Sequence, residues 1–161
     1  MKQQVICQPE VFQEALAHSL TMHGIAATTT QKEQWKEFYC RLIEGNNRMN
    51  LTALTAPVDV AEKHIADSLQ LANLLPQGAS IADVGSGAGL PGVPLAILRP
   101  DCSFVLLDAL AKRCHFLEET VAALGLSQVQ VMHLRAEDAG QKKELREHFQ
   151  IVTARAVAPL A

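Results

Sequence analysis

The stretch ADVGSGAGLPG, residues 82–92, decides the fold class because it places four glycines directly behind a short apolar run. Glycine loses much conformational freedom on folding, so this density indicates a chain that turns tightly or lets a ligand approach its backbone. Residues 80–84 suit a buried strand, and residues 93–98 suit a short helix. Strand, glycine-rich loop and helix together are typical of sites where backbone N–H groups meet an anion or a nucleotide.

The residues that follow repeat this alternation of strand and helix. We predict strands over 103–108, 129–134 and 149–154, a helix over 111–124, and a loop with a helix within 136–148. Apolar strands that alternate with helices are typical of an α/β fold with a doubly wound, mainly parallel sheet and helices on both faces. Such a sheet rarely ends after so few strands, so we expect further C-terminal strands to be missing from this chain.

The first part of the chain has apolar residues at helical spacing and is predicted to be helical. Residues 1–75 form an N-terminal helical extension, residues 76–161 form the ligand-binding core, and both belong to one structural domain. A first helix begins at Pro9 and ends at Gly24, with His23 on its apolar face.

The second helix of the extension is predicted from a capping box. Thr30 and Glu33 have the spacing at which an N-cap hydroxyl and a carboxylate each satisfy the other's backbone N–H. The sequence Gly-Asn-Asn at 45–47 then ends this helix. Pro57 starts the next helix, which runs to about residue 75.

Composition bounds the class of protein without fixing its function. The chain has 161 residues, 48% of them hydrophobic and 19% charged, and a net charge of −3, which neither requires nor excludes nucleic acid. Cys7, Cys40, Cys102 and Cys114 lie far apart, which argues against a zinc site or a disulfide framework and for a reducing cytoplasm. No apolar run approaches the roughly 20 residues of a membrane span. We expect a cytoplasmic protein that binds no metal and no membrane.

The loop alone does not fix the ligand class, and a carboxylate beside it narrows the choice. Residues 87–92 match the pattern G-x-G-x-x-G, so a dinucleotide site stays open. Asp83 would repel a diphosphate, and Pro91 would stiffen a turn that has to wrap one. Asp83 suits a ligand with a positive group, such as the amino group of S-adenosylmethionine. The alternative is a carboxylate that braces the loop through backbone N–H groups, and the two roles can coexist.

The other strands also end in polar residues, at the edge where a doubly wound sheet binds its ligand. Asp108 ends the second strand, where an acidic side chain holds the hydroxyls of an adenosine ribose; otherwise it caps the following helix. Ala136 and Glu137 would admit and bind an adenine, although Glu137 equally suits a helix start. Arg155 would contact a cofactor, a guanine O6 or a phosphate, or else form a structural ion pair.

Six motifs, taken in order, give the chain a resemblance to a known family. They are NRMNLTAL, KHIADSL, IADVGSGAGLPGVPLAI, LLDALAKRCHFL, LRAED and VTARAVA. With these motifs the chain resembles the bacterial small-subunit ribosomal RNA methyltransferase G family, also called glucose-inhibited division protein B. The resemblance implies a class I, Rossmann-like methyltransferase that uses S-adenosylmethionine and makes 7-methylguanosine in 16S rRNA, as free RNA or within the 30S subunit.

The resemblance also implies which residues contact the cofactor. Carried over position by position, they are Gly85, Leu90, Ala136, Glu137 and Arg155, to which the loop and strand ends add Asp83, Gly87 and Asp108. Guanine N7 carries a free lone pair, so its methylation needs alignment rather than proton removal, and no acid or base is assigned. Arg155 and His64 are the candidates for positioning the reactants, although His64 equally suits packing against the sheet.

A set of basic and polar residues could contact RNA. The candidates are Lys63, Lys112, Arg113 and Arg135, followed by His64, Arg48 and Asn50. Cations near the strand ends would meet phosphates, but each one alone is better explained as a solvated surface charge. We expect a monomer that acts on 16S rRNA or the 30S subunit. A class I methyltransferase with another substrate and an NAD-type Rossmann protein stay open as alternatives.

Overall fold

Four parallel strands form the central sheet of this protein, whose computed structural model describes residues 3–155. The strands run in the order β3-β2-β1-β4, and every neighbouring pair is parallel. Their bounds are β1 (Ser80–Val84), β2 (Ser103–Asp108), β3 (Val129–His133) and β4 (Ile151–Ala154). This arrangement confirms the predicted α/β fold with a doubly wound, mainly parallel sheet.

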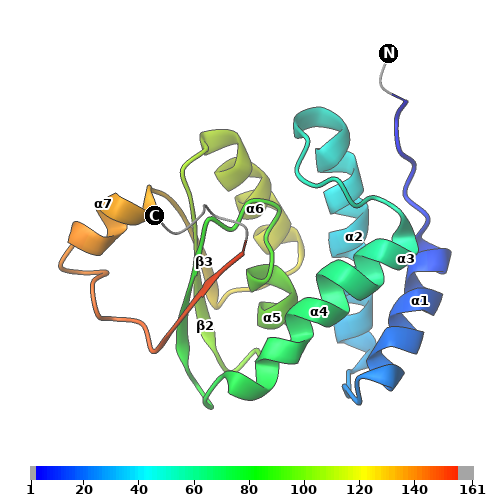
Figure 1. Ribbon diagram of the computed structural model, residues 1–161, viewed down its shortest axis with the longest axis horizontal. Helices are drawn as coiled ribbons and strands as arrows, with labels where there is room; N and C mark the ends of the chain where they lie inside the picture. Colours follow the sequence, from blue (N-terminus) through cyan, green and yellow to red (C-terminus); the bar gives the residue numbers. More distant parts are fainter. Residues whose placement is uncertain (1–2, 156–161) are drawn as a thin grey trace.

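Helices lie on both sides of the sheet (Figure 1). On one side are α5 (Gly92–Leu98) and α6 (Ala111–Ala123), backed by the N-terminal helices, and on the other is α7 (Ala136–Gln141). Strands β2 and β3 extend the sheet on one side of β1, whereas β4 pairs with its other side. The carboxyl ends of β1 and β4 therefore form the topological switch point, where open α/β sheets bind ligands.

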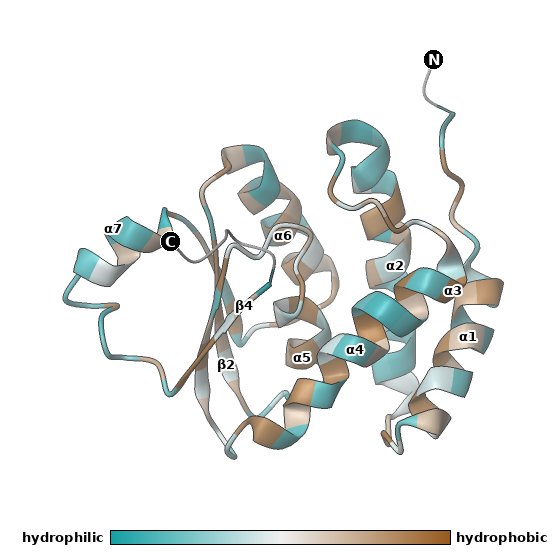
Figure 2. Cartoon of the chain, viewed as in Figure 1, coloured by the Kyte–Doolittle hydropathy of each residue, from teal (hydrophilic) through white to brown (hydrophobic). Residues whose placement is uncertain are grey.

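The N-terminal part of the chain is helical, as predicted. Its elements are α1 (Pro9–Met22), α2 (Thr29–Met49), α3 (Pro57–Asp59), the π-helix η1 (Val60–Ala66), α4 (Asp67–Leu69) and the 3₁₀-helix η2 (Gln70–Leu74). The hydrophobic faces of these helices turn inward (Figure 2), and Phe12 stacks on Tyr39 with ring centroids 4.5 Å apart. One cluster of buried side chains continues from α1 into the sheet. We propose that extension and core fold as one domain.

The first turns of α2 bind the C-terminal ends of two core helices. Carbonyl groups in the last turn of a helix have no partner within that helix. Gln31 Nε2 donates to the carbonyl oxygen of Ile97 at 3.1 Å, and Gln34 Nε2 donates to that of Leu124 at 2.9 Å. Ile97 lies in the last turn of α5, and Leu124 directly follows α6. These bonds attach the extension to the core.

The capping box of α2 lies two residues earlier than the sequence predicts. Thr28 is the N-cap: its Oγ1 accepts from the backbone N–H of Gln31 at 3.1 Å, and Gln31 Oε1 accepts from that of Thr28 at 2.9 Å. The prediction of Thr30 and Glu33 is therefore wrong. The helix starts earlier because the Gln31 side chain makes two bonds at once. Its Oε1 accepts from the backbone N–H of Thr28, and its Nε2 donates to the last turn of α5.

The predicted helix end at residues 45–47 is also wrong, because α2 continues to Met49. Gly45 allows close packing instead of ending the helix. A Cβ atom there would lie 2.8 Å from Cε2 of Phe116 in α6, so only glycine lets the two helices approach this closely. His23 differs from its prediction as well: α1 ends before it, and its side chain is exposed rather than part of the apolar face.

Cys7 and Cys40 form a disulfide, which contradicts the expectation that the spacing of the cysteines argues against disulfides. They are 33 residues apart in the sequence, but the segment before α1 runs back along α2 and brings their Cα atoms to 5.4 Å. A disulfide spans that separation. Cys102 and Cys114 are free and buried.

Candidate functional site

The glycine loop connects β1 to α5 at the switch point of the sheet. Gly85, Gly87 and Gly89 have φ angles of +68°, +54° and +93°, a left-handed backbone that residues with a side chain rarely adopt. The backbone N–H of Ser86 donates to the carbonyl oxygen of Leu107 at 2.9 Å, which ties the loop to the end of β2. Gly85 and Gly87 remain half-buried. The loop therefore presents glycine backbone at the carboxyl ends of β1 and β2.

Asp83 lies beneath the loop and is fully buried, with 0% of its surface exposed. Its Oδ2 accepts from the backbone N–H of Gly92 at 3.1 Å and from Ser86 Oγ at 3.0 Å. Its Oδ1 accepts from Thr153 Oγ1 of β4 at 3.0 Å. Asp83 offers no surface for the predicted contact with a positive group of a ligand. Its bonds match the alternative, because the carboxyl group holds β1, the loop, α5 and β4 together.

Asp83 is expected to make the stability of the fold depend on pH. Burial raises its pKa from 3.8 to about 7, against the opposing effect of the bonds from Ser86, Thr153 and Gly92. The folded protein therefore holds this proton more tightly than the unfolded chain does. The contribution to stability is complete below about pH 4 and is lost as the pH rises through about 7.

Urea unfolding of the wild type and of Asp83→Asn, followed between about pH 8 and about pH 5, measures this contribution. Because the amide does not titrate, the wild type should gain stability over the variant as the pH falls. All other titrating groups are common to both proteins and cancel in the difference. Parallel pH profiles would contradict the assignment of this dependence to Asp83.

Asp108, the last residue of β2, holds the loop from the neighbouring strand. Its Oδ2 accepts from the backbone N–H of Gly87 at 2.9 Å, and its Oδ1 accepts from that of Leu110 at 2.9 Å. The N-cap position of α6 belongs to Leu110, so Asp108 does not take the alternative role of helix cap. Arg113 Nη1 lies 3.9 Å from Oδ2. Asp108 is 4% exposed and each of its oxygens already accepts one backbone N–H, so hydroxyl donors of a ligand would have to reach the two acceptor sites that remain.

The start of α7 continues this edge beyond Asp108. The backbone N–H of Leu134 donates to the carbonyl oxygen of Asp108 at 3.0 Å, which joins the ends of β2 and β3. Ala136 and Glu137 follow in the first turn of α7, and both are exposed. Neighbouring strands lie about 4.8 Å apart, so the loop, Asp108 and Glu137 follow one another along the carboxyl edge. The structure thus brings these predicted cofactor contacts together.

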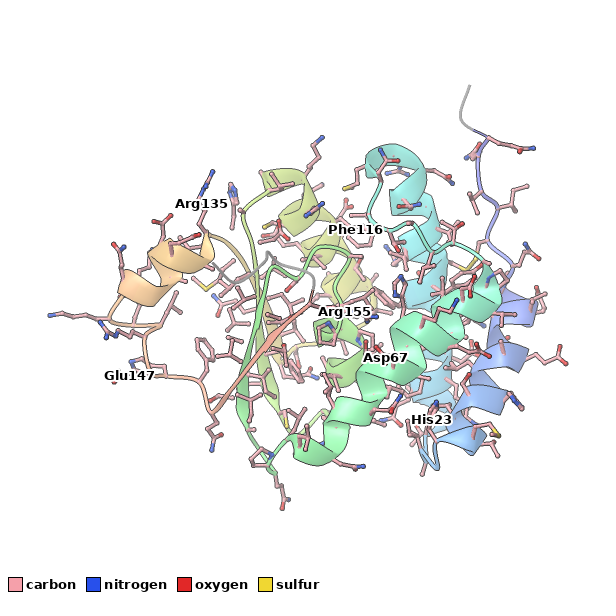
Figure 3. All side chains as sticks on the ribbon, in the orientation of Figure 1. His23, Asp67, Phe116, Arg135, Glu147 and Arg155 are labelled. Atoms are coloured by element: carbon pink, nitrogen blue, oxygen red, sulfur yellow. A yellow bond between two sulfur atoms is a disulfide. The ribbon has the colours of Figure 1, made fainter. Side chains whose placement is uncertain are left out.

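Two other predicted contacts, Leu90 and Arg155, lie outside this row. Leu90 is 8% exposed and belongs to the hydrophobic core beneath the loop. Arg155 follows β4 and turns toward the N-terminal helices, where its Nη2 donates to the carbonyl oxygen of Lys63 at 2.8 Å and lies 3.3 Å from Asp67 Oδ2 (Figure 3). This is the structural ion pair that the sequence left open as the alternative for Arg155.

His64 of η1 lies beside this ion pair and is 8% exposed. Its Nε2 is 2.8 Å from Thr52 Oγ1. Burial lowers the pKa of His64, and the positive charge of Arg155 lowers it further, so the imidazole is neutral at neutral pH. A buried, neutral histidine bonded to a threonine matches the packing alternative. A role for His64 in positioning the reactants stays a prediction.

Three of the predicted RNA contacts surround the carboxyl edge. Lys112 and Arg113 lie in the first turn of α6, and Arg135 directly precedes α7 (Figure 3). Lys112 and Arg135 are exposed and form no ion pair with any residue from 3 to 155. Arg113 is held near Asp108 by the ion pair described above. These cations are therefore placed to meet a polyanion that approaches the edge.

The remaining candidates lie on the N-terminal helices and already have partners. Lys63 pairs with Asp59 Oδ1 at 2.7 Å, and Arg48 pairs with Glu44 Oε1 at 2.5 Å. Asn50 ends α2 with a left-handed backbone, φ +53°. This group is separate from the cations at the carboxyl edge.

Sequence reasoning missed three hydroxyl groups that hold the site. Ser86 and Thr153 both donate to Asp83, and Thr52 bonds His64. Ser86 lies inside the glycine loop, so its closeness to Asp83 is a signal in the sequence. Thr153 becomes a neighbour only because β4 pairs with β1 in the register that sets it opposite Asp83.

Comparisons with known proteins agree with this architecture. The family described as rRNA small subunit methyltransferase G matches residues 31–161. The ribosomal RNA small subunit methyltransferase G of Lactobacillus helveticus is 45% identical over 146 residues, which cover 88% of this chain and 61% of that protein. The protein of the same name from Desulforamulus reducens is 47% identical over 135 residues, or 83% of this chain and 56% of that protein. The chain thus spans about three fifths of the length of these relatives.

A solved structure supports the fold independently. A putative protein-L-isoaspartate O-methyltransferase from Plasmodium falciparum, in complex with S-adenosyl-L-homocysteine, superposes with a TM-score of 0.57 at 18% identity. The match covers 89% of this chain and 72% of that one. At this identity the likeness shows a shared fold.

Proposed function

Since the chain belongs to the rRNA small subunit methyltransferase G family, we propose that it serves the S-adenosylmethionine-dependent methylation of guanine N7 in 16S rRNA. The observation that carries the proposal is the glycine loop at the switch point, held by Asp108 from β2 and braced by Asp83 from below. Family membership supports the substrate, and the geometry of the loop supports the cofactor.

The carboxyl edge fits a cofactor that carries adenosine. Asp108 would accept from the ribose hydroxyls, and Ala136 and Glu137 would lie beside the adenine. The backbone at Gly85 and Gly87 would approach the amino-acid part of the cofactor, and Asp83 would act only by fixing the shape of the loop. The end of β3 lies about 10 Å from that of β1, since two strand spacings separate them. That distance suits an extended adenosine.

The proposed reaction requires the protein to align guanine N7 with the methyl group of the cofactor, and it requires no proton transfer. S-adenosylmethionine supplies a methyl group activated by its sulfonium, and guanine N7 attacks with a lone pair that is already free. The residues of the edge would hold the two reactants in line and exclude water between them. His64 is neutral and cannot serve as a cationic anchor near neutral pH, and Arg155 would have to leave its ion pair with Asp67 to orient the guanine O6 or a phosphate.

The proposal also names partners and a compartment. Lys112, Arg113 and Arg135 would contact phosphates of 16S rRNA, as free RNA or within the 30S subunit, and the protein would act as a monomer in the cytoplasm. Between residues 3 and 155 no helix has both the length and the hydropathy that crossing a membrane requires. The same residues contain no cluster of three or more His, Cys, Asp or Glu side chains suited to hold a metal ion.

Calorimetry with S-adenosylhomocysteine and with NAD tests the cofactor. We expect heat of binding with S-adenosylhomocysteine and none with NAD, because the Asp108 carboxylate lies beside the glycine loop, where it would repel a diphosphate. Methyl transfer from labelled cofactor to 16S rRNA and to 30S subunits lacking the modification then tests the substrate. Binding of NAD alone would overturn the cofactor, and label on an exocyclic amine or a pyrimidine carbon would overturn the N7 assignment.

A further inference from the structure

The segment before α1 is fastened to α2 by one covalent bond and a few hydrogen bonds. We call residues 3–8 the strap. Cys7 of the strap is bonded to Cys40 of α2. The backbone N–H of Val5 donates to Asn47 Oδ1 at 3.0 Å, and Asn47 Nδ2 donates to the carbonyl oxygen of Val5 at 2.8 Å. The backbone N–H of Gln8 lies 3.4 Å from the hydroxyl oxygen of Tyr39.

Without the disulfide the strap would be held by a few hydrogen bonds and by the half-buried side chain of Val5, which packs against the core. Ordering a backbone costs conformational entropy at every residue, and exposed hydrogen bonds return little because water competes for the same groups. The bonds between Val5 and Asn47 are exposed, and Ile6 keeps 75% of its surface open to solvent. The disulfide is therefore the only covalent contact between the strap and α2 among residues 3–155, beside the packing of Val5.

The docked strap forms one wall of a polar hollow of about 570 Å³. Gln3, Gln4 and Val5 line it on one side, and Asn46 and Thr52 line it on the other. Asn46 Oδ1 accepts from the backbone N–H of Thr52 at 2.8 Å, and the hydroxyl of Thr52 bonds the buried His64. Release of the strap would open this hollow beside the loop that holds His64.

The proposed location in the cytoplasm bears on the role of the disulfide. Disulfides in cytoplasmic proteins are as a rule transient, catalytic or redox-sensing, because the thiol pool keeps structural cysteines reduced. We propose that Cys7 and Cys40 are a redox-active pair, which docks the strap on α2 when oxidised and releases it when a small dithiol reduces the bond. The cytoplasmic setting rests on the proposed function, whereas the chemistry of the pair does not.

Reduction proceeds by two thiol–disulfide exchanges. A thiolate of the dithiol attacks one sulfur, a mixed disulfide forms, the Cys7–Cys40 bond breaks, and the other cysteine leaves as a thiolate. The second thiolate of the reductant then breaks the mixed disulfide, closes the reductant's own ring and frees the remaining cysteine. Two electrons pass from the dithiol to the pair, and two protons end on Cys7 and Cys40. Both cysteines are half-buried, so a small reductant has access to them.

Thiol titration and amide exchange on the folded chain test the pair. Titration in denaturant should find two free thiols after equilibration with oxidised glutathione, since two of the four cysteines are bonded, and four after dithiothreitol. Hydrogen exchange in the strap peptide should become at least about tenfold faster on reduction, as expected when a docked segment opens locally. Four free thiols under both conditions, or equal exchange rates, would overturn the proposal.

Three variants distinguish the contribution of the Cys7–Cys40 disulfide to strap docking from that of the hydrogen bonds. Cys7→Ser and Cys40→Ser should each exchange as fast as the reduced wild type under both conditions. Asn47→Ala keeps both cysteines and removes only the acceptor of the Val5 N–H, so the other bonded strap amide, that of Gln8, should stay protected when oxidised and lose protection on reduction. Loss of protection at Gln8 in oxidised Asn47→Ala would show that the Asn47 side chain, not the disulfide, holds the strap. None of these measurements needs a cofactor, so a chain that fails to bind S-adenosylhomocysteine still decides the question.

Discussion

Replacing Gly92 with alanine is expected to destabilise the fold by about 3 kcal/mol, the upper end of the usual cost of overpacking. A Cβ atom at this position would lie 2.4 Å from Leu106 Cδ2 and 2.6 Å from Asp83 Oδ2. Leu106 is fully buried in β2, and the Asp83 carboxyl group is held by three donors, so neither neighbour can move away cheaply. The midpoint of urea unfolding, followed by circular dichroism, measures the loss.

Gly140→Ala is the matched control for this substitution. Gly140 lies within α7, and a Cβ atom there would meet nothing within 4 Å. Alanine is favoured over glycine in a helix, so this variant should be as stable as the wild type or slightly more stable. A Gly92→Ala protein that unfolds at the same urea concentration as Gly140→Ala would refute the close approach of α5 to Asp83.

Replacing Asp108 with alanine is expected to weaken binding of S-adenosylhomocysteine by about 30-fold. The substitution removes a charged acceptor for the ribose hydroxyls, and hydrogen bonds to a charged group contribute about 1.5–3 kcal/mol. It also releases the backbone N–H of Gly87, so the loop loses its attachment to β2. Calorimetry well below the unfolding temperature of the variant measures the dissociation constant.

Asp138→Ala tests whether this effect is local to Asp108. Asp138 also lies at the carboxyl edge and is exposed in the first turn of α7, but its side chain forms no hydrogen bond or ion pair with residues 3–155. Its removal should change the dissociation constant by less than about twofold, in line with the small effect of an exposed charge. Equal weakening by both variants would point to the net charge of the edge instead of a bond to Asp108.

The strands were predictable because a buried strand appears in the sequence as a short run of mostly apolar residues. The bounds of β1 and β2 match their predictions at both ends, since both strands are largely apolar, with β1 followed by the glycine loop and β2 ending in a carboxylate. The row of loop, Asp108 and Glu137 was predictable for a related reason. In a parallel sheet the residues after successive strands meet at one edge, so order along the chain predicts closeness in space.

Contacts that depend on distant pairing were beyond the sequence. The bond between Asp83 and Thr153 joins residues 70 positions apart and exists only because β4 pairs with β1. Arg155 turned out to face Asp67, because its direction depends on where the N-terminal helices pack. The disulfide was missed for the same reason: Cys7 lies before α1, and nothing local shows that this segment runs back along α2.

The bonds from Gln31 and Gln34 to the ends of α5 and α6 have a consequence for biosynthesis. A chain is synthesised from its N-terminus onward, so the residues of α2 have been translated before those of either core helix. Each core helix then finds a side-chain amide already available for the carbonyl groups of its last turn. A protein that lacked the first turns of α2 would leave the carbonyl groups of Ile97 and Leu124 without these donors.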